Sequence, residues 1–105
     1  MMRSVIYHGA ALKLNISIQP IDGVTMDEYD FKIEVFTPFS SETASIEKSE
    51  MIRIDEKNYR VLIDTKRLGL GSIGVKVIAE IPDGDFPDQT RTEIDVMDLG
   101  IDIIE

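Results

Sequence analysis

The fold is decided by residues 68–91, which read LGLGSIGVKVIAEIPDGDFPDQTR. In the first half of this stretch every second side chain is apolar: Ile73, Val75, Val77, Ala79 and Ile81. Because successive side chains of a strand point to opposite faces of a sheet, this period of two predicts a central strand with one buried face. Pro82 ends the strand, and an acidic loop follows at residues 83–89.

The same alternation recurs along the rest of the chain and predicts about seven or eight short strands in all. The clearest of the others cover residues 12–18, 31–35, 52–55, 59–63, 92–96 and 101–103. Residues 4–7 would add a short strand, and residues 40–49 would form either a loop with an edge strand at 44–48 or a short helical turn capped by Ser40 or Ser41. Residues 98–100 are expected to bend the chain between the last two strands. Strands at such regular spacing are typical of an all-β, immunoglobulin-like antiparallel β-sandwich, with a small barrel as the alternative.

One helical turn interrupts this pattern. Asp64 or Thr65 is a suitable cap, and Gly69 ends the turn. We expect Leu68 and Leu70 to fill the end of the core. No long helix is predicted.

Length and charge limit the classes of function. A chain of 105 residues has room for one domain, so we predict a single domain over residues 1–105, with residues 1–10 as a loose lead-in. A net charge of −9 is repelled by phosphate backbones and anionic lipids, so basic protein surfaces and cations fit better as partners. The N-terminal residues form neither a convincing signal peptide nor a membrane span, which predicts a protein that stays in the producing cell's cytoplasm or is assembled into a particle.

The acidic loop offers a candidate metal site. Asp83, Asp85 and Asp88 lie close together beside a glycine and a proline, and calcium prefers several oxygens from one flexible turn. The spacing differs from that of an EF-hand. Asp, Gly and Pro are also ordinary turn residues, so a purely structural turn is the competing interpretation.

Three aromatic residues and a methionine are candidates for contact with a partner. Phe36 and Phe39 flank Pro38, and Phe36 lies on the predicted outward face of its strand. With Met51 they would form an exposed apolar patch. Phe86 in the acidic loop would either anchor a partner or pack under its own hairpin.

Enzymatic features are weak, and we predict that the chain is not an enzyme. His8 is the only histidine, and nothing near it in sequence supplies a nucleophile or an orienting carboxylate. Gly69 and Gly71 precede a strand rather than a helix, so they lack the helix N-terminus that binds phosphate. The chain has no tryptophan for a carbohydrate platform.

Two segments carry a resemblance, residues 64–70 (DTKRLGL) and 81–93 (IPDGDFPDQTRTE). They resemble small immunoglobulin-like β-sandwich domains of phage or prophage type, similar to the N-terminal domain of phage baseplate or tail-fibre attachment proteins. The resemblance is limited to the C-terminal part of the chain and implies a structural or assembly role, with no functional residues attached.

Two hypotheses of function follow. The first is a non-enzymatic interaction module in a phage-like particle that contacts protein, another copy of itself included, through an edge strand or an apolar patch. The second is a calcium-assisted or carbohydrate-binding module centred on the aspartates of the acidic loop.

Overall fold

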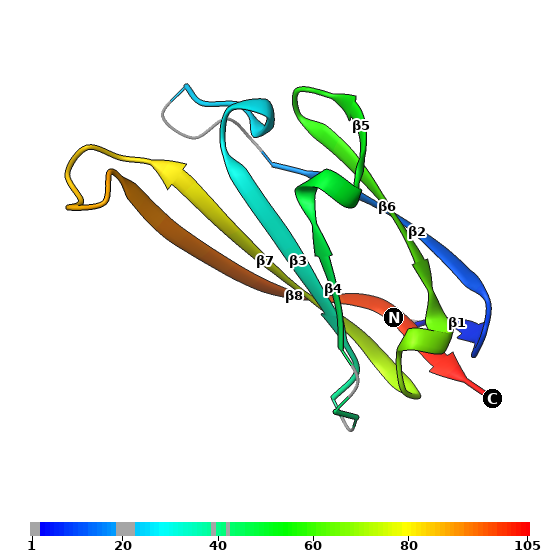
Figure 1. Cartoon of the computed structure of the whole chain (residues 1–105). Helices are drawn as coiled ribbons and strands as arrows, with labels where there is room; N and C mark the ends of the chain where they lie inside the picture. Colours follow the sequence, from blue (N-terminus) through cyan, green and yellow to red (C-terminus); the bar gives the residue numbers. More distant parts are fainter. Residues whose placement is uncertain (1–2, 19–22, 39, 42) are drawn as a thin grey trace.

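The computed structural model describes residues 3–18, 23–38, 40–41 and 43–105, and these residues form eight strands in two sheets (Figure 1). One sheet has five strands in the order β1-β8-β7-β3-β4, and the other has three in the order β2-β6-β5. The strands are β1 (Ser4–Tyr7), β2 (Ala11–Ser17), β3 (Asp30–Phe36), β4 (Thr43–Glu47), β5 (Ile52–Asp55), β6 (Asn58–Asp64), β7 (Gly71–Pro82) and β8 (Thr90–Ile104). Single 3-10 turns lie at η1 (Met26–Glu28), η2 (Lys48–Glu50) and η3 (Thr65–Arg67).

The predicted central strand is confirmed as β7. It pairs antiparallel with β3 on one side and with β8 on the other. Its apolar row faces the three-stranded sheet, and Val75, Ala79 and Ile81 are buried. Residues paired across a sheet share a face, so Val35, the partner of Val75, continues this buried row into β3.

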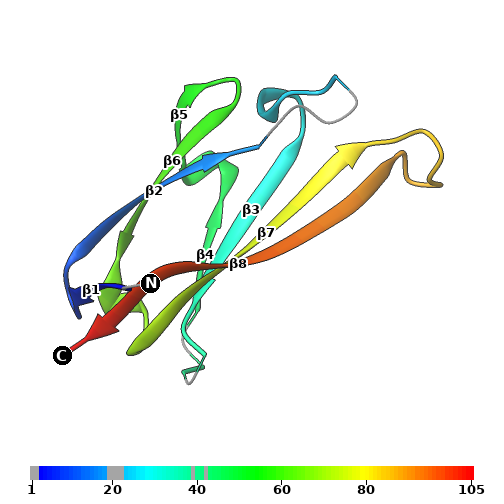
Figure 2. The same cartoon turned by 180° about the vertical axis from the view of Figure 1, so that it is seen from behind.

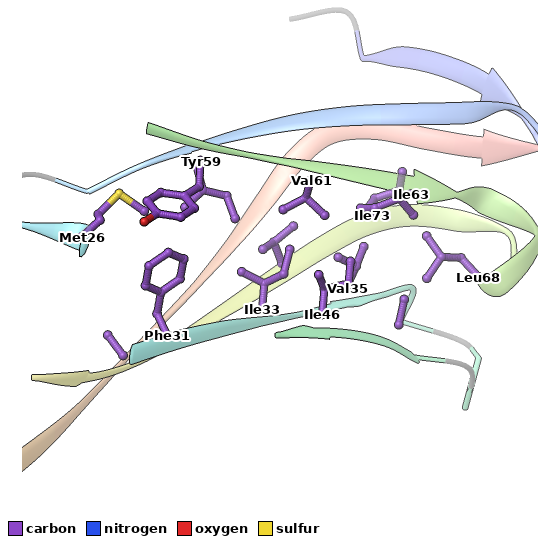
Figure 3. Close-up of a cluster of buried hydrophobic side chains, with 14 of the residues drawn as sticks. Met26, Phe31, Ile33, Val35, Ile46, Tyr59, Val61, Ile63, Leu68 and Ile73 are labelled. Atoms are coloured by element: carbon purple, nitrogen blue, oxygen red, sulfur yellow. The ribbon is translucent and has the colours of Figure 1, made fainter. Parts of the chain in front are cut away.

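The core lies between the two sheets (Figure 3). At one end Phe31 meets Tyr59 edge to face, with ring centroids 5.1 Å apart and planes at 88°. At the other end Leu68, just after η3, is fully buried. Burial of side chains of this size stabilises a fold by about 1.5–3 kcal/mol each.

The prediction of a purely antiparallel sandwich was wrong, because β1 runs parallel to the end of β8 and makes the five-stranded sheet mixed. Arg3 secures this pairing, with nitrogen atoms 3.0 and 2.9 Å from carboxylate oxygens of Asp98 and Asp102. Alternation shows which residues share a face of a strand, but it carries no information on strand direction.

The prediction of two short strands separated by a bend was also wrong, since β8 is continuous across residues 98–100. A β-bulge takes up the bend, because residues 99–101 lie opposite Ile73 alone. Gly100 has a φ of 73°, a left-handed conformation that glycine adopts without steric cost, and its N–H donates to Oδ1 of Asp98 at 2.7 Å.

The helical turn at residues 64–68 is confirmed as η3. The Asp64 side chain accepts a hydrogen bond from the Lys66 N–H at 3.0 Å, as expected of a cap. The prediction that both flanking leucines fill the core was wrong for Leu70, which is 44% exposed. No helix among the described residues is long and apolar enough to span a membrane.

Replacement of Leu68 by alanine is expected to lower the free energy of unfolding by about 2–5 kcal/mol, because it leaves a cavity at a fully buried position. Leu70→Ala is the matched control and should change it by no more than about 0.5 kcal/mol. Urea unfolding of both variants measures the difference, and equal losses would contradict the placement of the two leucines.

Candidate functional site

An exposed apolar row lies on the outward face of β8. Ile94 and Val96 are each 57% exposed, and their partners on β7 are Ile78 and Lys76. These positions alternate with the buried row of β7, so they point away from the core. Alternating apolar residues ordinarily mark the buried side of a strand, whereas those of β8 at positions 94 and 96 face solvent.

Phe36 extends this surface across the sheet. It pairs with Gly74, and its ring lies over that glycine: a β-carbon at position 74 would be 2.5 Å from Phe36 Cζ. Gly74 therefore makes room for the ring on the same outward face as Ile94. We call Phe36, Ile78, Ile94 and Val96 the outer patch.

Charges of both signs border the outer patch. Lys76 lies beside Glu34, with the Lys76 Nζ 4.0 Å from Glu34 Oε1. Lys32 pairs with Ile78 on the neighbouring strand. Lys76 and Glu34 lie between Phe36 and Ile78 along their strands, so charges of both signs lie within the outer patch as well as beside it.

The opposite face of β8 borders a groove between the two sheets. The groove has a volume of about 730 Å³ and lies between β2, β7 and β8. Val75 and Val77 of β7 contribute to its lining, as do Glu93, Asp95 and Met97 of β8. We call this space the inner groove. Figure 2 shows the two sheets from behind, with the β7–β8 hairpin extending beyond the body of the molecule.

The other predicted contact residues are dispersed. Phe86 is 45% exposed and lies in the turn between β7 and β8, beyond Pro82, far along the strand from the Gly74 position beside Phe36. Met51 is partly buried and packs against the core. Phe39 lies outside the described residues. Of the described members of the predicted set, Phe36 alone lies on the outward face beside Gly74 of β7, and its side chain is half-buried there.

Two of the three aspartates of the acidic loop accept hydrogen bonds from the loop or from the start of β8. Asp83 accepts from Arg91 Nη1 at 2.7 Å and from the Asp85 N–H at 3.0 Å, and the arginine, as the larger effect, lowers the pKa of Asp83. Asp88 accepts from the Thr90 N–H at 3.3 Å. The described residues contain no group of three or more His, Cys, Asp or Glu side chains placed to hold a metal ion.

A polar cluster that the sequence did not suggest joins the two sheets around Asp27. Arg53 donates two hydrogen bonds to its carboxylate, at 2.9 and 2.7 Å, and the Tyr59 hydroxyl donates a third at 2.5 Å. The hydrogen bonds from Arg53 first, and then that from Tyr59, lower the pKa of Asp27 to about 2. Lys48 donates to the carbonyl groups of Met26 and Tyr29 at 2.8 and 2.7 Å. Together these contacts hold η1 against β5, β6 and η2.

His8 has a structural contact. Its Nε2 lies 2.9 Å from the carbonyl oxygen of Leu68, and since a carbonyl only accepts, the ring nitrogen is the donor. The bond connects the β1–β2 turn to the residue that follows η3.

Comparison with protein-family models, curated proteins and solved structures found no match to this chain. The class of protein that the fold defines is a two-sheet, all-β domain.

Asp27→Asn is expected to reduce the loss of stability in acid. Because the pKa of Asp27 falls from 3.8 to about 2 on folding, its contribution is present above about pH 4 and is lost as pH falls through 2. Urea unfolding at pH 6 and pH 2.5 should therefore show a smaller difference for the variant than for the wild type. Asp85→Asn is the control, and an unchanged difference in Asp27→Asn would contradict the role of the cluster.

Calcium at millimolar concentration is expected to leave the melting temperature unchanged relative to chelator. The Asp83 carboxylate is already paired with Arg91, so a cation would have to displace that guanidinium. Scanning calorimetry measures the shift. A rise in melting temperature that Asp83→Asn abolishes would instead support a calcium site, because a ligand of the native state must stabilise it.

Proposed function

We propose that this chain is a non-enzymatic interaction module that acts by protein–protein contact, with a second copy of itself as the partner of the outer patch. The observation that carries the proposal is the exposure of Ile94 and Val96, both 57%, side by side with Ile78 on one sheet face. Contiguous exposed apolar surface of this kind marks sites of association.

The charge pattern around the outer patch favours a second copy. Lys32 and Lys76 lie on the same face as Glu34, so a two-fold axis that passes between the two signs brings the lysines of each copy opposite the glutamate of the other. A partner of one strong charge would meet like charges on part of this surface. The mixed border therefore favours self-association.

We also propose the immunoglobulin-like arrangement for the two sheets. We take β2, β3, β5, β6, β7 and β8 as strands B, C, D, E, F and G. The order β8-β7-β3 then matches G-F-C, and β2-β6-β5 matches B-E-D. The resemblance of residues 64–70 and 81–93 to phage attachment domains supports a phage-like particle as the setting. A position among tail or capsid genes would support that setting, and a position among unrelated metabolic genes would count against it.

Sedimentation velocity tests the self-association. The wild-type chain is expected to form dimers as its concentration rises from about 5 to 500 μM, and the double variant Ile94→Ser, Val96→Ser should weaken the dimer at least about tenfold, because truncation of central apolar contacts costs most in an interface. Leu62→Ser is the control, since Leu62 is 56% exposed on the other sheet. A wild-type chain that stays monomeric throughout would refute the proposal.

A further inference from the structure

We infer that the inner groove binds an extended, basic segment of a partner protein, which adds as a strand to the free edge of β8. This inference goes beyond the self-association proposed above, because it uses the opposite face of β8 and a different partner. Three observations support it: unpaired strand edges, an apolar lining, and unpaired negative charge in the groove wall.

Two strand edges border the inner groove without a partner among the described residues. β1 pairs with β8 only at residues 101–104, so the edge of β8 at residues 93–99 has no neighbouring strand. β2 lies at the end of its sheet and pairs with β6 alone. Backbone N–H and C=O groups on such an edge can form hydrogen bonds with an added strand. A small apolar ligand has no groups that could make these hydrogen bonds.

The lining of the inner groove suits an extended segment, whose side chains point alternately to opposite sides. Val75 and Val77 of β7 form part of the groove wall, together with Leu14 of β2 and Met97 of β8. An extended segment directs every second side chain to the same face, so alternate residues would enter the groove, apolar ones beside Met97 and basic ones beside Asp95, while the others stay outside. At about 3.3 Å per residue, the edge at residues 93–99 accommodates a segment of about six to eight residues.

Charge determines what kind of segment fits. Asp95 pairs with Val77 in the sheet register and lies in the groove wall, and it has no ion pair within the described part of the chain. Glu93, two residues before Asp95, forms an ion pair with Arg91, which also pairs with Asp83. With a net charge of −9 on the whole chain, the groove attracts a cationic segment and repels an acidic one. A second copy is disfavoured in this groove for the same reason.

Fluorescence anisotropy with synthetic peptides tests the inference on the full chain. The probe is a labelled ten-residue peptide in which every second residue is threonine and the positions between them are valine and lysine in turn, so that one face of the strand carries both apolar and basic side chains. We expect it to bind with a Kd in the micromolar range, and the same peptide with glutamate in place of lysine should bind at least about tenfold more weakly. Methylation of every second backbone nitrogen should also weaken binding at least about tenfold, because a methylated nitrogen cannot donate to a strand edge.

Two charge reversals locate the site. Asp95→Lys should weaken binding of the basic peptide at least about tenfold, whereas Asp88→Lys, an equal charge change in the β7–β8 turn, should weaken it less than about threefold. Circular dichroism checks that both variants keep the fold. If Asp95→Lys fails to fold, Asp95→Asn replaces it, with an expected weakening of at least about threefold.

Several results would overturn the inference: no binding at millimolar peptide, equal binding of the acidic peptide, no effect of N-methylation, or equal effects of the two reversals. Binding of a fatty acid without binding of the basic peptide would make the groove a lipid site and would also overturn it. The self-association proposal is tested separately with Val96→Ser, because Val96 lies in the outer patch and not in the lining of the inner groove. This variant should weaken the dimer and leave peptide binding within about threefold of wild type.

Discussion

The pairing of β7 with β8 is the constraint on which both candidate surfaces depend. Residues paired across a sheet lie on the same face, so the burial of Val75 requires Met97 to face the other sheet. The same register turns Ile94 toward solvent and directs Asp95 into the groove wall. A shift by one residue would exchange these faces, removing the outer patch and the acidic wall of the inner groove together.

The two ends of the sandwich are closed in different ways. At one end Asp27 accepts hydrogen bonds from Arg53 and Tyr59, and this cluster joins the segment before β3 to the three-stranded sheet. At the other end the packing is apolar, with Leu68 fully buried after η3. Between them the groove is open along β8, where Asp95 is exposed to water and its charge carries no burial cost.

Much of the fold could be predicted because its signals are local. The alternation of residues 73–81 identified the central strand, and the short separation of β5 from β6 identified their pairing. The cap at Asp64 identified η3. The candidate site was harder to predict from the sequence. One signal for it lies in the sequence: the residues at the odd positions 97, 99, 101 and 103 are all apolar. If β8 is one continuous strand, these side chains point inward, and the side chains at the even positions 94 and 96 must then point outward.

The sequence by itself determined where strands and turns lie, because alternation, proline, glycine and caps act over a few neighbouring residues. Tertiary structure alone decided which face of β8 is turned toward the three-stranded sheet, that β1 runs parallel, and that Asp27 meets Arg53 from 26 residues away. The physical reason is that an alternating strand has two equivalent faces until another layer covers one of them. In this chain the three-stranded sheet covers one face of β7 and leaves the groove beside β8 open.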